Sequence, residues 1–314
     1  MRESLTSILR CPGCHADGTL GLTATRCDRR EVREGALTCA QCGRRFAVEQ
    51  GIADLLLDAP EFVRRERAGL DRFADLMRAD GWDRERILAL PDVDLPYWHG
   101  QRAAIDALCE RVRFTPGERL LDVGSNTCWA SNSFAARGLA VVALDIASTE
   151  LQGLRTADYF LERGEVFFER LLSVMFDPAL AAESMDYVFC CEVLHHNDPD
   201  HLRRSFCELY RVLRPGGYLF LVNEPLRFPL KLKRDHGREV AQFEGNEHVY
   251  FLHQYYLAAR RAGFRVAIPA LRRARSRRGP LLGVAGAGRS LWRHLISGDL
   301  PLTMDCRKPT GAVP

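Results

Sequence analysis

The sequence predicts a doubly wound α/β fold preceded by a small cysteine-rich segment. Strand-like apolar runs alternate with segments of helical period from residue 119 onward, and cysteines gather in pairs near the start of the chain. Apolar strands that alternate with helices are typical of a parallel sheet covered on both faces. With 314 residues, 46% of them hydrophobic and 27% charged, the chain has room for such a domain and an appendage.

The net charge and the hydropathy of the chain bear on whether it binds a polyanion or spans a membrane. The formal net charge of +3 is too small to indicate a polyanionic partner by itself. The N-terminal stretch has no apolar run after its charged residue, and the longest apolar stretches are far too short to span a bilayer. We therefore expect a cytoplasmic protein without a membrane partner. Nothing in the composition indicates an oligomeric state.

Four cysteines within the first 42 residues have the spacing of a structural zinc site. Cys11 and Cys14 form one CxxC pair, and Cys39 and Cys42 form another. A gap of two residues lets both sulfurs of a pair point at a common centre, and four thiolates leave no position for a catalytic water. We therefore predict one structural zinc ion. Four free thiols in a small domain are the alternative.

The same stretches resemble a known small fold. "LRCPGC" and "LTCAQCGRRFAVEQGIADLL" are similar to the zinc ribbon of the activator subunit of tRNA and protein methyltransferases, and to ribbons that head some bacterial methyltransferases. The similarity covers residues 5–57, and we place a zinc-ribbon domain at 1–57. A helical linker or cap region follows at 58–113, because apolar residues recur there at intervals of three and four.

A structured loop, "ALPDVDLPYWHGQ", interrupts this helical region. Its two prolines and its aromatic pair, Tyr97 and Trp98, favour an ordered conformation. The loop could form part of a lid over a pocket. Alternatively, the two rings pack the helices onto the body of the protein.

The stretch "LLDVGSNTCWASNSFAARG" predicts a strand followed by a ligand-binding turn. In a doubly wound sheet, ligands bind beyond the carboxyl ends of the strands, and the first strand-to-helix turn is the natural cradle. Here that turn runs from Gly124 to Cys128. Asp145 ends the next strand, about 20 residues downstream, where a carboxylate can accept hydrogen bonds from both ribose hydroxyls. The turn and the acid together predict a cofactor that contains a ribose.

A later stretch decides which cofactor is meant. "MDYVFCCEVLHHNDPDHLRRSFCELYRVLRPGGYLFLVNEP" resembles the class I S-adenosylmethionine-dependent methyltransferases, especially the branch of ubiquinone, menaquinone, natural-product and sugar methyltransferases. The resemblance covers residues 100–309. It implies S-adenosylmethionine as cofactor and a Rossmann-like, seven-stranded sheet whose last strand runs antiparallel. We place this methyltransferase domain at 114–314, with insertions at 226–248 and 272–300.

The predicted cofactor-binding residues follow the first, second, third and fourth strands of this domain. They are Asp122, Gly124, Ser125, Asn126, Asp145, Ile146, Met175, Phe176 and Glu192. Related families often place an acid after the third strand to meet the adenine amino group. Because this sequence has none in a suitable place, Met175, Phe176 and the backbone are expected to hold adenine.

Two residues depart from the usual glycine-rich turn. Asn126 tolerates unusual backbone angles, so the turn is expected to survive. Cys128 introduces a side chain that would narrow the space for the methionine end of the cofactor. Its place near a helix N-terminus also makes it a candidate activated thiol, against the alternative of an inert, buried one.

Methyl transfer from a sulfonium requires in-line positioning in a dry pocket, and a base when the acceptor is a hydroxyl or a protonated amine. The candidate bases are His196, His195 and Glu224, with His196 preferred. Packing or a structural hydrogen bond is the alternative for each histidine. His248 precedes a helix and is a further candidate, expected to face the acceptor; otherwise it is a bystander beside a helix cap.

Alternatives remain open for the segment "HHNDPDH", for the basic residues and for the function of the whole chain. A metal site in "HHNDPDH" is not favoured, because Asp198 and Asp200 suit the start of a helix.

The acceptor is expected to be a small molecule, such as a saccharide or a natural product. RNA is the alternative, since the run from Arg272 to Arg278 could bind phosphates. A non-catalytic scaffold or partner subunit is the third hypothesis.

Overall fold

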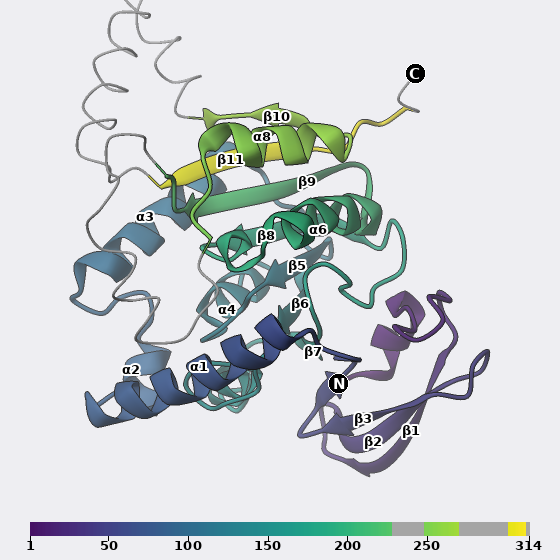
Figure 1. The fold of residues 1–314 in the computed structure, drawn as a ribbon. Helices are drawn as coiled ribbons and strands as arrows, with labels where there is room; N and C mark the ends of the chain where they lie inside the picture. Colours follow the sequence, from purple (N-terminus) through teal and green to yellow (C-terminus); the bar gives the residue numbers. More distant parts are fainter. Residues whose placement is uncertain (228–247, 270–300, 312–314) are drawn as a thin grey trace, which may run out of the picture.

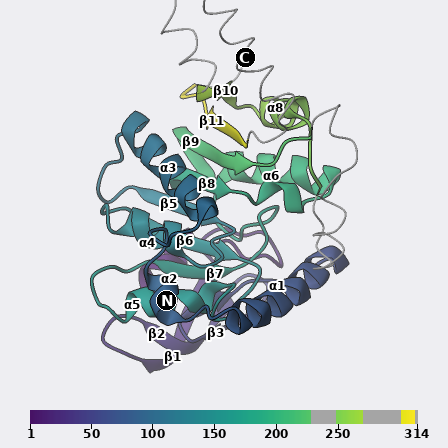
Figure 2. The ribbon, with the colours of Figure 1, turned by 90° about the vertical axis from the view of Figure 1, so that its left-hand side faces the viewer.

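The computed structural model describes residues 1–227, 248–269 and 301–311, which build one mixed sheet of eleven strands. The order of the strands is β1-β2-β3-β4-β7-β6-β5-β8-β9-β11-β10. Figures 1 and 2 show β1 to β3 at one end of the molecule and β10 and β11 at the other. The run from Arg272 to Arg278 and most of the two insertions predicted at 226–248 and 272–300 lie outside the described residues.

The strands of the N-terminal ribbon are β1 (Leu20–Cys27), β2 (Val32–Cys39), β3 (Arg45–Glu49) and β4 (Ile52–Asp54). Those of the larger part are β5 (Arg119–Val123), β6 (Ala140–Asp145), β7 (Glu169–Leu172), β8 (Met185–Cys191), β9 (Leu213–Glu224), β10 (Arg265–Ala267) and β11 (Leu302–Arg307). The α-helices are α1 (Glu61–Ala79), α2 (Arg84–Leu88), α3 (Pro96–Arg111), α4 (Trp129–Ala135), α5 (Ala157–Leu161), α6 (Pro199–Val212) and α8 (Leu252–Arg261). Short 3₁₀ helices are η1 (Glu3–Ile8), η2 (Leu154–Thr156) and η3 (Leu194–His196).

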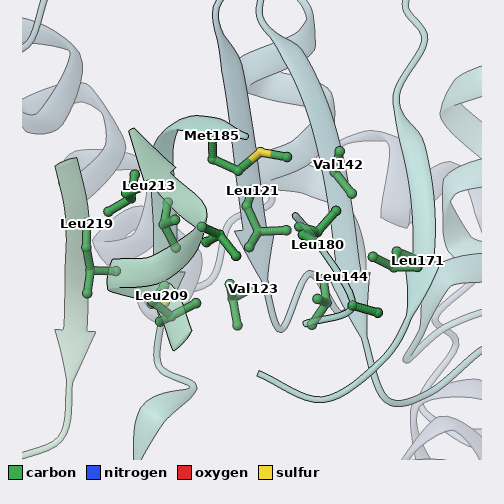
Figure 3. Close-up of a cluster of buried hydrophobic side chains, with 14 of the residues drawn as sticks. Leu121, Val123, Val142, Leu144, Leu171, Leu180, Met185, Leu209, Leu213 and Leu219 are labelled. Atoms are coloured by element: carbon green, nitrogen blue, oxygen red, sulfur yellow. The ribbon is translucent and has the colours of Figure 1, made fainter. Parts of the chain in front are cut away.

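Two hydrophobic cores cover the two faces of the central strands. Leu121 and Val123 of β5 pack with Leu144 in one core, shown in Figure 3. Leu120 of the same strand packs with Phe134 of α4 in the other core. This alternation follows from the two-residue period of a strand. Burial on both faces explains why the strands are almost continuously apolar in sequence.

The number of strands differs from the prediction. The sequence predicts seven strands, whereas the sheet of the described residues has eleven. The difference arises because β4 pairs in parallel with β7, from Ile52 opposite Arg170 to Asp54 opposite Leu172, and thereby joins the four ribbon strands to the larger sheet. At the opposite end β11 runs antiparallel to β9. The predicted domain boundary at residue 57 therefore divides the chain, but the strands on both sides of it belong to one sheet.

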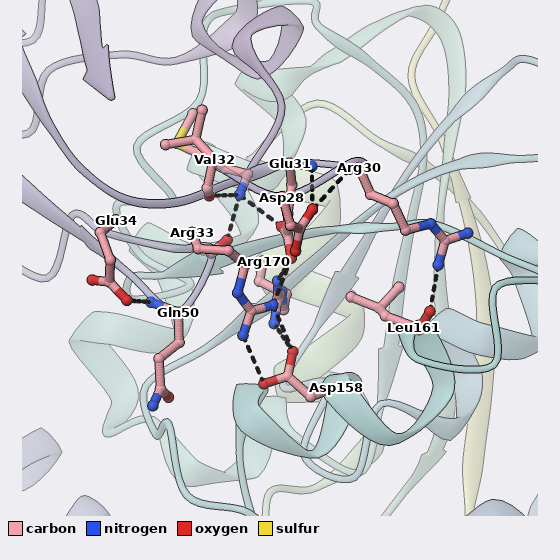
Figure 4. Close-up of polar contacts among 12 residues, drawn as sticks. Asp28, Arg30, Glu31, Val32, Arg33, Glu34, Gln50, Asp158, Leu161 and Arg170 are labelled. Atoms are coloured by element: carbon pink, nitrogen blue, oxygen red, sulfur yellow. Dashed lines mark hydrogen bonds and ion pairs between the residues drawn. The ribbon is translucent and has the colours of Figure 1, made fainter. Parts of the chain in front are cut away.

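A buried ion network fixes the ribbon to the larger part, as Figure 4 shows. The guanidinium of Arg170 on β7 lies 2.5 Å from Glu31 and 2.6 Å from Asp158. Arg33 contacts the same two carboxylates at 2.8 and 3.1 Å. The terminal amine of Met1 also lies 2.7 Å from Glu31. Removal of one member would leave an uncompensated buried charge, which is strongly destabilising.

Candidate active site

A pocket of about 590 Å³ lies beyond the carboxyl ends of β5 and β8. Its floor comes from the ends of these strands and the turns that follow them, and it includes Asp122, Gly124, Ser125, Asn126, Thr127, Glu192, His195 and His196. Its roof comes from α1, α3 and the loop before α2, and it includes Glu66, Leu70, Phe73, Met77, Trp82, Tyr97, Trp98 and Gln101. The region predicted as a cap therefore lies over the edge of the sheet where ligands bind in such folds.

The turn after β5 keeps the shape of a glycine-rich turn. Gly124 has a φ of +66°, and a Cβ atom there would lie 2.3 Å from a methyl carbon of Val193. Asn126 and Cys128 also adopt positive φ angles, of 45° and 56°. Because asparagine enters the left-handed region more easily than most residues, the first replacement costs little. Both residues that replace a glycine thus have the positive φ angles that glycine adopts most readily.

Cys128 lies in the core and not at the surface of the pocket. Its side chain is completely buried, packs in the core around Phe134, and does not line the pocket. Burial raises the pKa of the thiol well above its ordinary value. A buried thiol with a raised pKa is inert as a nucleophile. The burial of Cys128 thus favours the alternative of an inert thiol over an activated one.

Two buried acceptor atoms in the pocket floor have no hydrogen-bond partner among the described residues. They are Oδ1 of Asn126 and Oγ1 of Thr127. The amide nitrogen of Asn126 is engaged, because it donates to Gln152 at 2.7 Å. Buried polar atoms are usually satisfied, and a bound ligand is one way to satisfy them. The floor therefore offers hydrogen-bonding positions to a polar ligand.

Asp145 organises the turn from the end of β6. One of its carboxylate oxygens accepts from the backbone N–H of Asn126 at 2.8 Å, and the other accepts from that of Ala147 at 2.9 Å. Burial raises the pKa of Asp145 to about 6, against the lowering effect of these N–H groups. The buried Asp122 on β5 has its pKa raised by burial to about 7, while its hydrogen bond from Ser131 lowers it.

Three residues expected to bind the cofactor, of which Met175 and Phe176 are expected to hold adenine, lie beside the pocket under the N-terminal part of α1. Ile146, Met175 and Phe176 belong to a small apolar cluster with Phe62 and Val63 and do not line the pocket. The ring centroids of Phe62 and Phe176 are 5.8 Å apart. Helix α1 thus covers this part of the sheet edge. The assignment of Met175 and Phe176 to adenine stays a prediction, as does the assignment of Ile146 to the cofactor.

His195 and Glu224 form a buried pair at the pocket wall. Nδ1 of His195 lies 3.1 Å from Oε2 of Glu224, and His195 lines the pocket. Glu224 also accepts hydrogen bonds from the backbone N–H groups of Val193 and Leu194, and from the hydroxyl of Tyr255. Burial alone would raise the pKa of Glu224, but His195 and the backbone donors lower it below its ordinary value. An ionised Glu224 therefore orients the imidazole of His195, which lines the pocket.

The other two candidate histidines, His196 and His248, lie close to this pair. The ring of His196 lies 4.2 Å from that of His195, and its Nδ1 lies 3.1 Å from Oε1 of Glu66 on α1. His248 donates its backbone N–H to the carbonyl of His195 at 2.7 Å, while its side chain stacks near Tyr250 and does not line the pocket. The backbone of His248 thus lies beside the site, whereas its imidazole does not line the pocket.

The roof is tied to the floor by polar contacts that the sequence did not reveal. The hydroxyl of Tyr97 donates to Glu192 at 2.8 Å, and Glu66 meets His196. Burial raises the pKa of Glu192, while Tyr97 and Gln101 lower it. The sequence contained one signal for Glu66. It shares one face of α1 with Leu70, Phe73 and Met77 and is therefore a polar residue on an apolar stripe.

The ribbon holds four sulfur atoms in a compact group. The sulfurs of Cys11, Cys14, Cys39 and Cys42 lie within 4.8 Å of one another. The distances are 3.7 Å from Cys11 to Cys42 and 3.7 Å from Cys14 to Cys39. Four thiolates at such separations fit a tetrahedral zinc ion. Within the described part of the chain, no second group with metal-binding spacing occurs, and Asp198 caps helix α6 instead.

Two families match the chain. Residues 121–221 match the family described as "Methyltransferase domain", and residues 2–51 match "Trm112p-like protein". Each match covers less than half of the chain: its first part is similar to Trm112p-like proteins, and its central part is similar to methyltransferase domains. The two resemblances drawn from the sequence are confirmed.

Curated relatives match over part of their length. "Ubiquinone biosynthesis O-methyltransferase" of Xanthomonas axonopodis pv. citri is 36% identical over 157 residues, which are 48% of this chain and 59% of the relative. "Demethylmenaquinone methyltransferase" of Tropheryma whipplei is 29% identical over 139 residues, covering 41% of this chain and 51% of the relative. The chain thus spans about half the length of these relatives.

The fold also matches solved structures. Phosphoethanolamine N-methyltransferase 2 of Haemonchus contortus, in complex with phosphomonomethylethanolamine and S-adenosylhomocysteine, superposes with a TM-score of 0.51 at 18% identity. The match covers 78% of this chain and 60% of that one. At this identity the likeness concerns the fold alone. Among the helices described, none is both long and apolar enough to cross a membrane.

Proposed function

We propose that this chain transfers a methyl group from S-adenosylmethionine to a hydroxyl group of a small molecule, with His195 as the base. The observation that carries the proposal is the pair of His195 and Glu224, which presents an oriented imidazole to the pocket. The sequence favours His196 over His195. The geometry favours His195, because a fully buried carboxylate holds it, while His196 contacts Glu66 of the roof.

The cofactor would lie on the floor of the pocket. Asn126 and Thr127 offer acceptor atoms that lack partners among the described residues, and Asp145 shapes the turn that carries them. Gly124 lets the backbone approach closely. S-adenosylmethionine, when bound, supplies a methyl group on a positively charged sulfur. Position and exclusion of water are then the main contributions that the protein must make.

The base acts on the acceptor. With S-adenosylmethionine bound as the methyl donor, Nε2 of His195 would take the proton that the acceptor hydroxyl gives up when it is methylated. Glu224 stabilises the imidazolium that results, because its ionised oxygen lies 3.1 Å from Nδ1. The name of the 36% identical relative, an O-methyltransferase, supports oxygen as the methylated atom.

The proposal is tested with His195→Gln, which keeps a polar side chain but removes the base. A general base typically contributes about 10²–10⁴-fold to the rate, so kcat should fall by such a factor with catechols as trial acceptors. The affinity for S-adenosylmethionine should stay unchanged, because the residue is proposed to act on the acceptor. Wild-type kcat in His195→Gln would exclude this residue as the base.

A further inference from the structure

Helix α8 presents apolar side chains to solvent. It lies with β10 and β11 at the end of the molecule opposite the ribbon (Figure 1). Leu252, Tyr256 and Leu257 are 38%, 40% and 43% exposed. Residues four apart on a helix share a face, so Leu252 and Tyr256 are neighbours and Leu257 lies next to them. An outward face of α8 is therefore apolar where a surface helix normally has polar residues.

The opposite face of α8 already holds the helix in place. Tyr255, Ala258 and Ala259 are buried and pack in the core with Phe264. The hydroxyl of Tyr255 also donates to Glu224 at the end of β9, at 3.3 Å. A rotation of α8 that hid its exposed leucines would take these residues out of the core. The apolar side chains are therefore a fixed part of the surface.

Arginines continue the same face toward the end of α8. Arg260 and Arg261 are exposed, and they follow Tyr256 and Leu257 by four residues each. Neither arginine forms an ion pair with a carboxylate among the residues that the structure describes. The sequence from 248 to 269 contains no aspartate or glutamate at all. The positive charge of this face is therefore not compensated locally.

The outer face of α8, as we call it here, consists of Leu252, Tyr256, Leu257, Arg260 and Arg261. Its chemistry matches the surface of an anionic lipid bilayer. Leucine side chains enter the boundary between headgroups and acyl chains, and tyrosine favours the level of the headgroups. Arginines near such a surface are attracted to its negative charge. RNA would attract the arginines as well, but its phosphates and sugars offer no cover for aliphatic side chains. The two leucines therefore favour lipid over RNA.

We propose that the outer face of α8 docks this chain on the surface of an anionic lipid bilayer. Leu252 and Leu257 insert between the headgroups, while Arg260 and Arg261 bind lipid phosphates. The sequence predicts no membrane partner, because no apolar stretch is long enough to span a bilayer. A helix that lies in the plane of the interface needs no such stretch. The inference goes beyond the proposed methyl transfer and does not depend on it.

Cosedimentation of the full, zinc-loaded chain with lipid vesicles tests this inference. Vesicles that contain about 30% phosphatidylserine in phosphatidylcholine are compared with vesicles of phosphatidylcholine alone. The anionic vesicles should bind the chain at least about tenfold more tightly, because each arginine near the surface contributes about fivefold. Salt at about 0.5 M should remove most of this difference, since it screens exposed charges.

Two pairs of variants locate the docking surface. Leu257→Gln should weaken binding to the anionic vesicles about fivefold, because a half-exposed leucine no longer enters the bilayer. Leu76→Gln is its control, a similarly exposed leucine on α1, and should bind like the wild type. Arg261→Gln should also weaken binding about fivefold. Its control is Arg64→Gln, an exposed arginine of α1 that pairs with Glu61, and this variant should bind like the wild type.

Three results would overturn the inference. The first is equal binding to the two kinds of vesicle, or equal losses in each variant and its control. The second is tighter binding of a single-stranded oligoribonucleotide at the same phosphate concentration, lost in Arg261→Gln but kept in Leu257→Gln, which would assign the face to RNA. The third is a dimer in sedimentation of the chain alone that Leu257→Gln dissociates, without vesicle binding, which would assign the face to a second copy.

Discussion

Nδ1 of His195 lies 3.1 Å from Oε2 of Glu224, a carboxylate that is fully buried at the end of β9. Glu224→Gln should therefore lower kcat about ten- to a hundredfold, because the imidazolium formed in the reaction loses its counter-charge. The acidic limb of the pH–rate profile should move to lower pH for the same reason. Steady-state kinetics across pH measures both effects.

Tyr255→Phe is the matched control for this substitution. Its hydroxyl donates to the same oxygen of Glu224 at 3.3 Å, but its loss leaves the carboxylate charge in place. This variant should keep the wild-type pH–rate profile. A profile that shifts equally in Tyr255→Phe and Glu224→Gln would mean that packing, and not charge, is the contribution of Glu224.

The zinc ribbon should contain about one zinc ion per chain, because four sulfurs lie within 4.8 Å of one another. Cys39→Ser should lose the ion and unfold the N-terminal strands locally, since structural zinc contributes folding free energy. Cys27→Ser serves as control, because Cys27 is exposed and outside the group. Elemental analysis that returns a full zinc complement for Cys39→Ser would refute the assignment.

Asp145→Ala should weaken binding of S-adenosylmethionine by roughly 1.5–3 kcal/mol, the usual cost of losing a charge-assisted hydrogen bond. The substitution also removes the acceptor for the backbone N–H of Asn126. Calorimetry gives the affinity, and circular dichroism shows whether the fold is retained. Unchanged affinity in a folded variant would place the ribose elsewhere.

Asp122 should make stability depend on pH. Burial raises its pKa to about 7, above the unfolded value of about 3.9, so the folded state binds the proton more tightly. Its contribution to stability is therefore fully present below about pH 4 and is lost as the pH rises through about 7.

Asp122→Asn tests this pH dependence, because asparagine keeps the acceptor for Ser131 but does not titrate. Between about pH 4 and pH 7 the free energy of unfolding of the wild type should fall relative to that of the variant by on the order of a few kcal/mol. Urea unfolding at several pH values measures the difference. Parallel curves for the two proteins would show that Asp122 does not titrate in this range.

Local features of the site were predictable from sequence because they depend on neighbouring residues. The turn at Gly124 and the cap at Asp198 are set by a few adjacent side chains, and the structure has both. Likewise, the CxxC spacing of the ribbon brings the paired sulfurs together before any long-range contact forms.

Contacts between distant segments were not predictable in this way. Glu66 and His196 are far apart in the chain and meet only because α1 folds across the sheet edge. The pairing of β4 with β7 likewise depends on where the ribbon docks. No periodicity in the sequence records such an arrangement, so the number of strands in the sheet and the contacts between roof and floor had to come from the structure, although the sequence did suggest Tyr97 and Trp98 as part of a lid.

Titration of S-adenosylmethionine into the purified chain by calorimetry tests the central claim most directly. The turn in the pocket floor has residues with positive φ angles, and Asn126 and Thr127 carry acceptor atoms without partners among the described residues. We therefore predict one binding site for S-adenosylmethionine, with a Kd in the micromolar range. The absence of binding by a folded, zinc-loaded protein would contradict the account and favour a scaffold over an enzyme.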